Sequence, residues 1–378
     1  MSPAYLTRSE TDAVRKPVNE ASLLPPRCYQ DPAFYALEIE RVFMRSWLPV
    51  GRVEQVANPG DYFTLDLFNE PVLIVRDRAG RLHAHSNVCR HRSRVVVEGA
   101  GTCTGLFTCP YHGWSYELDG RLKRATYMDK AQSFDQQSIR LPALKLEVWH
   151  GFIFINFDVN ARSLLEQLQP LEPIVAPFKL EQMRATPTLH SQAADWNWKV
   201  TMENFTEAMH HSVVHGESLE PMFPAGICEY DDADGPYSVF WMPTRDNSPM
   251  PELFPYVKDI PRKYQCALGV VNIYPFFHVL FDPSSILWLN WNFKSVELHE
   301  LSWKLLVPES TLRLGDFGQR CNEYVSKFLI PVVAEDIPAS QQTAKGLRSR
   351  FARPGRISWM EKSVNQFHNF MLQKLEAD

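Results

Sequence analysis

The alternation of hydrophobic and polar residues dominates the chain from Trp47 to about Phe157. A period of two, broken by glycine, asparagine, aspartate and proline, is typical of short β-strands that bury one face. The pattern therefore predicts small antiparallel sheets in this region, with loops at their tips. The predicted strands are Tyr62–Leu67, Pro71–Arg76, Leu82–His85, Ser115–Leu118 and Gly151–Phe157.

Apolar residues at helical spacing lie on both sides of this β region. Residues 31–45 open with Asp31 and Pro32, a common helix start, and continue with the spacing of one amphipathic helix. A short helix is also expected at Leu164–Leu168, before a linker with spaced prolines. The β region is thus expected to follow one helix and precede another.

The rest of the chain mixes both periods. Leu189–Trp198 is predicted as a strand, Lys199–Val214 as a single helix, and Tyr237–Pro308 as a succession of aromatic strands. Further helices are predicted at Phe317–Phe328, Asp336–Leu347 and Ser358–Lys374. This mixture predicts an α+β fold, in which helices cover a twisted antiparallel sheet.

These patterns divide the chain into three expected parts. Residues 1–45 are expected to form a helical segment that packs on the last domain. Residues 46–160 are expected to form an all-β domain, and residues 161–378 an α+β domain. A chain of 378 residues is long enough for two such cores.

Composition excludes several classes of function. The net charge is −5 and no basic block occurs, so we expect no nucleic-acid partner. No run of about 18 apolar residues occurs, and residues 1–16 are polar, so we expect neither a membrane span nor a secretory signal, and a cytoplasmic location. The seven cysteines are expected to be reduced thiols.

The first candidate metal ligands are two mixed pairs, each with one cysteine and one histidine: Cys89 with His91, and Cys109 with His112. Two thiolates and two imidazoles are the ligand set of a Rieske 2Fe-2S cluster, with the thiolates on one iron and the imidazoles on the other. The alternative is structural zinc, but zinc sites usually pair Cys with Cys and His with His. Cys103 has no partner at ligand spacing and is expected to be a small buried residue.

A second group of possible ligands lies at 197–215, with two acids and three histidines. Two imidazoles and one carboxylate form the facial triad that holds non-haem Fe(II) and leaves positions open for oxygen. A regular helix would place His211 and His215 on one face. The pair of His210 and His215 would require the helix to bend or end between them, and both pairs stay open on spacing alone.

The whole pattern resembles the catalytic (alpha) subunit of the Rieske non-haem iron ring-hydroxylating oxygenases. The resemblance runs from the helix at Asp31, through both mixed pairs and the motif Glu-Asn-x-x-Glu-x-x-His-x₄-His, to a last helix with Glu361 and His368. It implies a Rieske domain over 46–160 and a catalytic domain with a mononuclear iron over 161–378. The chain departs from the pattern at Gln341 and Ala344.

The resemblance also implies a set of site residues. The cluster ligands would be Cys89, His91, Cys109 and His112, and the iron ligands His210, His215 and Asp336, with Glu335 as the alternative carboxylate. Without a metal, Glu335 and Asp336 would simply be acids that favour the start of a helix. Glu207 and Asn204 are expected to be catalytic residues. Asn204 would support the iron's surroundings. His211 is expected to lie at the surface or behind the ligands, and the other histidines, including His299, are expected to be structural or to face solvent.

By the same resemblance, Glu207 would bridge an iron-bound histidine to a Rieske histidine of a neighbour in a head-to-tail homotrimer. Electrons would come from a separate NAD(P)H-dependent reductase, with a ferredoxin as a further candidate, because the chain has no G-x-G-x-x-G after a strand and no plant-type ferredoxin motif. The implied reaction uses O₂ to hydroxylate or oxidatively demethylate a small aromatic, N-methylated or quaternary ammonium substrate. The alternatives are aromatic cis-dihydroxylation and a Rieske electron-transfer protein without oxygenase activity.

Overall fold

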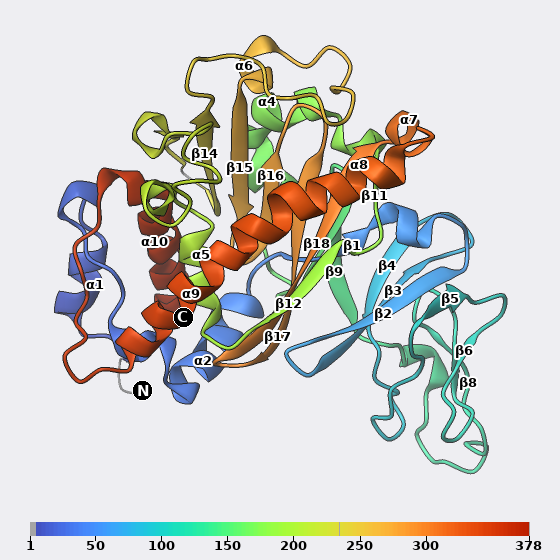
Figure 1. Ribbon diagram of the computed structural model, residues 1–378. Coiled ribbons are helices and arrows are strands. Elements are labelled where there is room, and N and C mark those ends of the chain that lie inside the picture. Colours follow the sequence, from blue (N-terminus) through green and yellow to red (C-terminus); the bar gives the residue numbers. More distant parts are fainter. Residues whose placement is uncertain (1–4, 234, 378) are drawn as a thin grey trace. The chain divides into compact units, whose positions relative to one another are not determined.

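The structure is a computed structural model that describes residues 5–233 and 235–377. The chain divides into two compact units, one formed by residues 44–165 and the other by residues 1–43 together with 166–378. Figure 1 shows the first unit in light blue to blue-green and the second in the remaining colours. Among the described helices, none has both the length and the apolar character that a membrane crossing requires.

The unit of residues 44–165 is built on β-strands. Seven strands form one antiparallel sheet in the order β1-β10-β9-β4-β3-β2-β5, and three short strands form a second sheet in the order β6-β7-β8. The strands are β1 Leu48–Arg52, β2 Asp61–Leu67, β3 Glu70–Arg76, β4 Leu82–Ser86, β5 Ala100–Thr102, β6 Phe107–Thr108, β7 Ser115–Tyr116, β8 Leu122–Arg124, β9 Ala143–Trp149 and β10 Phe152–Asn156.

The five strands expected from alternation are confirmed, four of them at nearly full length. The exception is the strand expected at Ser115–Leu118, which ends at Tyr116. The hairpin turn to β8 begins directly afterwards, because the backbone of Glu117 hydrogen bonds with both Gly120 and Arg121. Alternation does not reveal where such a turn interrupts a strand.

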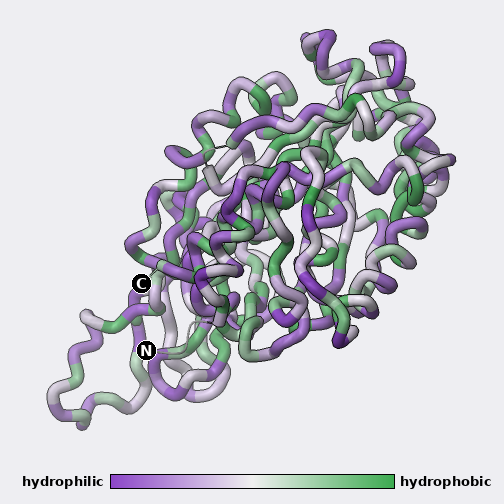
Figure 2. Tube along the Cα trace, turned by 90° about the vertical axis from the view of Figure 1, so that its left-hand side faces the viewer, coloured by the Kyte–Doolittle hydropathy of each residue, from purple (hydrophilic) through white to green (hydrophobic). Residues whose placement is uncertain are grey.

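The second unit is built on an eight-stranded antiparallel sheet. Seven strands lie in the order β11-β18-β17-β16-β15-β14-β13, and β12 pairs with β18. Figure 2 shows hydrophobic residues interspersed with hydrophilic ones along the inner strands, and mainly hydrophilic colour on outer loops. The strands are β11 Met183–Ala185, β12 His190–Ala194, β13 Glu229–Tyr230, β14 Tyr237–Pro243, β15 Ala267–Ile273, β16 Phe277–Phe281, β17 Ile286–Ser295 and β18 Leu298–Pro308.

Helices cover this sheet. Figure 1 shows α8 and α9 crossing one face of the sheet as one long helical segment, joined by a π-helical turn at Val325–Leu329. Its buried side chains, such as Leu329 and Val333, pack against Trp303 and Leu305 of β18. The helices are α1 Arg8–Val14, α2 Pro32–Glu38, α3 Leu164–Leu168, α4 Glu172–Val175, α5 Trp198–Asn204, α6 Arg262–Gln265, α7 Glu309–Leu312, α8 Phe317–Tyr324, α9 Ile330–Leu347 and α10 Lys362–Glu376.

The α+β architecture is therefore as expected. The prediction of a single helix over Lys199–Val214 is wrong. Helix α5 ends at Asn204, and the chain resumes helical form only as a 3₁₀ turn at Met209–Ser212. The carboxylate of Glu207 accepts the backbone N–H groups of Met209 and His210. A continuous helix would have given those N–H groups to carbonyls four residues earlier, so Glu207 begins a separate turn after α5 has ended.

Two further boundaries differ from the sequence patterns. The strand expected at Leu189–Trp198 is confined to β12, because Asn197 caps α5 through its side chain. Helix α9 begins at Ile330, so Glu335 and Asp336 lie inside it and do not open it. The interpretation of these acids as residues that favour a helix start is therefore wrong.

A buried ion pair ties α5 to the N-terminal helices. The Nζ atom of Lys199 lies 2.6 Å from the carboxylate of Glu38, and both side chains are fully buried. The indole of Trp198 donates to the same carboxylate at 3.2 Å. Helix α2 and the π-helical turn at Ile39–Phe43 thus belong to the unit that holds α5.

Candidate metal centres

The two cysteine loops of the β unit are the same turn built twice. In each loop the cysteine N–H donates to the carbonyl five residues later, at 2.8 Å for both Cys89 and Cys109. The fourth residue after each cysteine, Ser93 or Gly113, donates back to the cysteine carbonyl at 3.0 and 3.1 Å. Both of these residues have positive φ, 54° and 73°, which allows the chain to turn back so sharply.

The loops bury their thiols and present their imidazoles. Cys89 and Cys109 are each 2% exposed and belong to the core that joins the two sheets, whereas His91 is exposed. The rings of His91 and His112 lie 4.7 Å apart, and His91 stacks on Trp114 at 4.9 Å. Burial, with a further contribution from the adjacent Cys89 thiol, raises the pKa of Cys109.

This donor set fits a 2Fe-2S cluster. Two adjacent thiols lie on the buried side and two adjacent imidazoles on the outer side, as a cluster with unlike ligands on its two irons requires. The hydroxyl of Tyr116 lies 3.2 Å from the Cys89 sulfur, where a hydrogen bond would raise the cluster's potential.

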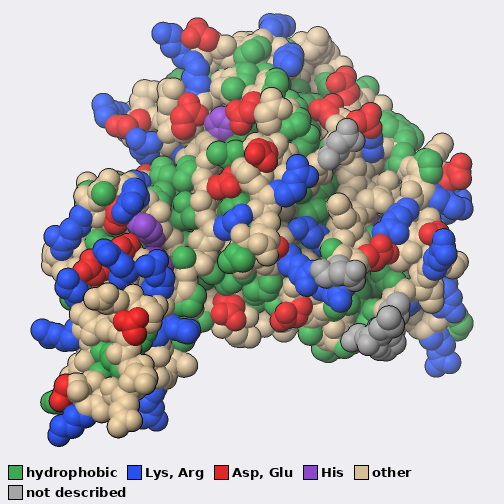
Figure 3. Space-filling view, turned by 180° about the vertical axis from the view of Figure 1, so that it is seen from behind, with side chains coloured by type: hydrophobic (Ala, Val, Ile, Leu, Met, Phe, Trp, Pro, Cys, Tyr) green, Lys and Arg blue, Asp and Glu red, His purple; other side chains and the backbone are tan. Residues whose placement is uncertain are grey.

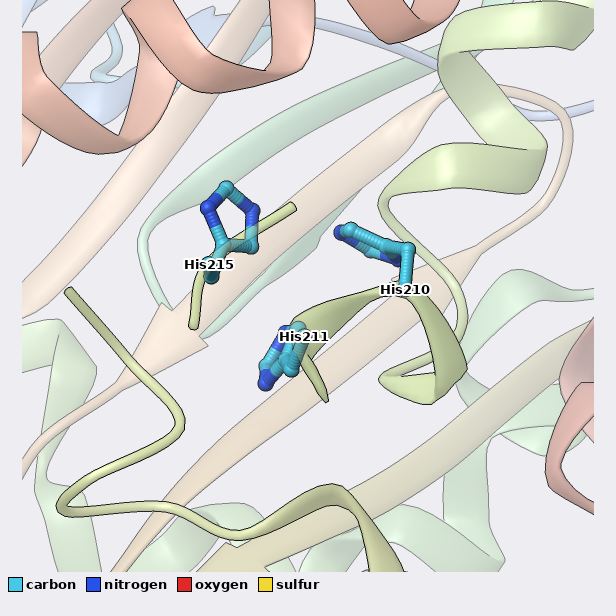
Figure 4. Close-up of side chains that lie close together, drawn as sticks. All are labelled: His210, His211 and His215. Atoms are coloured by element: carbon cyan, nitrogen blue, oxygen red, sulfur yellow. The ribbon is translucent and has the colours of Figure 1, made fainter. Parts of the chain in front are cut away.

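The second candidate centre follows the break after α5. The 3₁₀ turn and the residues after it bring nitrogens of His210, His211 and His215 within 4.8 Å of one another. Figure 4 shows the three rings converging from this one segment. The sequence pattern named these residues but left open which two act together.

Carboxylates distinguish two of the three histidines. Glu207 Oε1 lies 2.5 Å from His210 Nδ1, and Glu335 Oε2 lies 2.7 Å from His215 Nδ1. The remaining Nε2 atoms of His210 and His215 lie 3.6 and 3.1 Å from the same oxygen of Asp336. Metal-bound histidines commonly have this arrangement, with a carboxylate that accepts the N–H of the nitrogen not bound to metal.

His211 has a different environment. It is 4% exposed, it hydrogen bonds with the backbone of Phe223, and its Nδ1 has no partner among the described residues. Burial, followed by the neighbouring imidazoles of His210 and His215, lowers the pKa of His211 to about 3. Its nitrogens are therefore not oriented by a carboxylate as those of the other two are.

Asn204 connects the parts of this centre. It is the last residue of α5, and its Nδ2 donates to Asp336 at 3.1 Å and lies 3.3 Å from His210 Nε2. The residue directly before it, Glu203, lies 2.8 Å from Nε2 of His368 in α10. The end of α5 is thus held by both α9 and α10.

The sequence patterns missed Ser218, whose hydroxyl donates to Glu335 at 2.6 Å. They also missed that Glu335 lies behind His215, 120 positions away along the chain. No spacing signal marks either contact, because each joins segments that meet only in the folded sheet and helix layer. Burial alone would lower the pKa of His215, but the carboxylates of Asp336 and Glu335 outweigh it and raise that pKa.

A cavity opens in front of the three histidines. Its empty volume, part of it open to solvent, is about 790 Å³. Polar groups lie at the metal centre, and the walls are mainly apolar. The wall residues include Phe205, Leu219, Phe240, Met242, Leu268, Val270, Leu280, Leu289, Trp303 and Phe328.

Two family models match the chain. Residues 46–135 match the Rieske [2Fe-2S] domain, and residues 178–377 match the ring hydroxylating alpha subunit (catalytic domain). The second match alone spans more than half of the chain, so the protein belongs to the family of Rieske ring-hydroxylating oxygenase alpha subunits. The family expected from the sequence motifs is confirmed, and the zinc alternative for the first centre is not supported.

Individual relatives give further comparisons. The carnitine monooxygenase oxygenase subunit of Escherichia coli (strain K12) is 36% identical over 203 residues, which are 52% of this chain and 53% of that protein. The glycine betaine monooxygenase oxygenase subunit of Chromohalobacter salexigens is 34% identical over 238 residues, 62% of this chain and 51% of that protein. The matched region thus spans about half the length of these relatives.

Solved structures share the fold over nearly the whole chain. A quaternary ammonium Rieske monooxygenase in complex with L-carnitine has a TM-score of 0.77 and 22% identity, covering 97% of this chain and 98% of that one. Naphthalene 1,2-dioxygenase from Rhodococcus sp., bound to indole, has a TM-score of 0.78 and 18% identity, covering 98% and 99%. At these identities the likeness shows the fold: an all-β Rieske domain followed by an α+β catalytic domain, as expected.

Proposed function

We propose that this chain is the terminal oxygenase component of a Rieske non-haem iron system, which uses O₂ to oxidise a small organic substrate. The main support is the arrangement of His210 and His215. The Nδ1 atom of each imidazole contacts a glutamate carboxylate, and both Nε2 atoms face one oxygen of Asp336 beside a cavity. A Rieske electron carrier would have no use for such a centre. The family match supports the same assignment.

The iron ligands would be His210, His215 and Asp336. Glu207 and Glu335 would each accept a hydrogen bond from an Nδ1–H group, which fixes the tautomer and leaves a lone pair on Nε2 for the metal. Three carboxylates beside two imidazoles suit a divalent cation. When bound, a ferrous ion in such a triad supplies open positions for dioxygen, and the cluster supplies electrons one at a time.

Asp336 is favoured over Glu335 as the carboxylate ligand. The Asp336 oxygen lies near both Nε2 atoms, whereas Glu335 contacts the opposite nitrogen of His215 and the hydroxyl of Ser218. Asn204 donates to Asp336 and so holds that carboxylate in place. Cys89, His91, Cys109 and His112 would hold the cluster.

Electrons would come from a separate NAD(P)H-dependent reductase, directly or through a ferredoxin, and would pass between subunits of a homotrimer. The exposed surface near each centre supports a subunit contact. Met209 and Val213 are 47% and 85% exposed beside His210, and Tyr111 is 52% exposed beside His112. Glu207 would then lie between an iron ligand and the neighbour's Rieske histidine.

The reaction would be hydroxylation or oxidative demethylation. The relatives named above act on carnitine and glycine betaine, according to their names. The apolar walls of the cavity favour a second candidate, cis-dihydroxylation of an aromatic ring. Figure 3 shows acidic and basic side chains intermixed over one face, without a continuous basic surface on that side. A small-molecule substrate and a cytoplasmic location remain our predictions.

Metal analysis tests the proposal before any substrate is known. Protein reconstituted anaerobically should hold about three irons and two acid-labile sulfides per chain. The double variant His210→Ala and His215→Ala should keep about two irons and lose all oxygenated product. His211→Gln is the matched control and should keep all three irons. Two irons in the unaltered protein would favour the electron carrier, and a colourless, sulfide-free protein would exclude both functions.

Products should then be analysed with a surrogate reductase. The substrate panel should contain aromatic acids, N-methylated betaines and steroids. Incorporation of one or of two oxygen atoms from ¹⁸O₂ separates monooxygenation from cis-dihydroxylation.

A further inference from the structure

The imidazole of His278 is buried without any hydrogen-bond partner. His278 lies on β16 and is 4% exposed, and neither of its ring nitrogens has a partner among the described residues. Burial lowers the pKa of His278 to about 3, so the ring is neutral and offers one N–H donor and one acceptor. Most buried polar groups in proteins are paired, so this exception needs an explanation.

His278 lines the same cavity as the three histidines of the metal centre. Its ring contacts are aromatic, with Trp291 at 5.4 Å and Phe205 at 6.4 Å between ring centres. It is a polar group of the cavity that lies outside the metal centre and is not engaged by another side chain of the described chain. A group of this kind is where a bound molecule would make its polar contact.

The charges of the cavity narrow the choice of that molecule. No Lys or Arg occurs among the described residues that line it, so a substrate carboxylate would find no cationic partner there. Its acids, Glu207 and Asp336, already contact His210 and His215. A quaternary ammonium group has no donor or acceptor and would leave His278 unpaired. A hydroxyl or carbonyl oxygen would pair with it.

We propose that His278 is a substrate-positioning residue, which hydrogen bonds to the hydroxyl or carbonyl oxygen of an uncharged, otherwise apolar ring compound. The inference rests on the proposed function only in treating this cavity as the substrate site. The apolar walls bind the ring, and the single hydrogen bond sets which carbon of the ring faces the metal centre.

Binding of two matched probes tests the proposal. The dissociation constants of 1-naphthol and naphthalene should be measured by equilibrium dialysis with the full, iron-loaded chain under anaerobic conditions. His278→Leu keeps a similar volume and removes both polar atoms. It should reduce the preference for 1-naphthol over naphthalene by about tenfold, which is the usual worth of one buried hydrogen bond. His278→Asn, which keeps a donor and an acceptor, should retain part of that preference.

Leu280→Val is the control, since Leu280 also lines the cavity. It should change the affinity for both probes alike and leave their ratio intact. An unchanged ratio in His278→Leu would overturn the proposal, as would an equal change of ratio in Leu280→Val. If glycine betaine bound more tightly than 1-naphthol and displaced it from the cavity, the proposed class of substrate, an uncharged ring compound, would be wrong.

No reductase or turnover enters this measurement. Missing oxygenated products would therefore count against the proposed function and leave the binding result standing. Loss of the probe preference in properly folded His278→Leu would likewise support the positioning role whatever reaction the chain catalyses. The turnover experiment and the binding experiment can therefore fail independently of each other.

Discussion

Glu335 and Asp336 are neighbours in α9, yet their carboxylates contact opposite nitrogens of one imidazole, that of His215. Glu335 lies 2.7 Å from Nδ1, and Asp336 lies 3.1 Å from Nε2. Adjacent residues on a helix point about 100° apart, so they can reach the two edges of a ring that lies against the helix. In the proposed centre, Glu335 would thereby orient the imidazole of His215, and Asp336 would bind the metal beside it.

This geometry gives different expectations for the two acids. Asp336→Asn should abolish tight binding of the mononuclear iron, because it removes a ligand charge. Glu335→Gln should retain iron but lower its affinity by about 10–100-fold, the usual cost of altering a group that orients a metal ligand. Anaerobic Fe(II) titration of both variants measures the difference. Equal and complete loss of iron in Glu335→Gln would instead make Glu335 a ligand.

Glu207→Gln tests the path of the electron. A glutamine oxygen can still accept from His210 Nδ1, so both metals should remain bound. The variant loses the negative charge between His210 and the proposed neighbouring cluster. Reoxidation of the reduced cluster by O₂ in the presence of substrate, followed by stopped-flow absorbance, should slow by at least about tenfold. An unchanged rate would contradict transfer through Glu207.

The buried pair of Glu38 and Lys199 should be important for stability. Lys199→Met leaves the carboxylate of Glu38 buried without its cation and should destabilise the protein by about 3–5 kcal/mol. The double variant with Glu38→Leu should recover part of that loss. Chemical denaturation measures both. The control is Lys327→Met, which breaks an exposed pair with Glu323 and should change stability by less than about 0.5 kcal/mol.

His299 should make the protein sensitive to acid. Burial lowers the pKa of His299 to about 4, and its Nε2 lies 2.9 Å from the hydroxyl of Thr201 in α5. The unfolded chain binds this proton near pH 6.5, above the folded pKa, so acid favours unfolding. The contribution of neutral, buried His299 to the free energy of unfolding is complete above pH 6.5 and is lost as the pH falls toward 4.

The comparison of wild type with His299→Gln isolates this effect from other histidines. Wild type should lose roughly 1–2 kcal/mol more than the variant between pH 7 and pH 5, measured by urea denaturation. Parallel losses in the two proteins would mean that His299 does not carry the acid sensitivity.

Features that depend on near neighbours along the chain can be predicted from the sequence alone. The cluster pairs are closed loops of six residues, so Cys89 and His91, or Cys109 and His112, must lie near each other wherever the loops sit. The β-strands of the first unit follow from alternation, because a strand with one buried face requires it. The family and the α+β fold followed from these motifs together.

Which histidines and which acid converge depends on how the chain packs in three dimensions. The choice of His210 over His211 depends on the end of α5 at Asn204, on the carboxylate of Glu207 and on the carboxylates that α9 supplies. The position of His278 in the cavity depends on how β16 lies in the sheet. Such contacts join residues far apart in sequence, and no periodic pattern records them, because they arise only when strands and helices pack into layers.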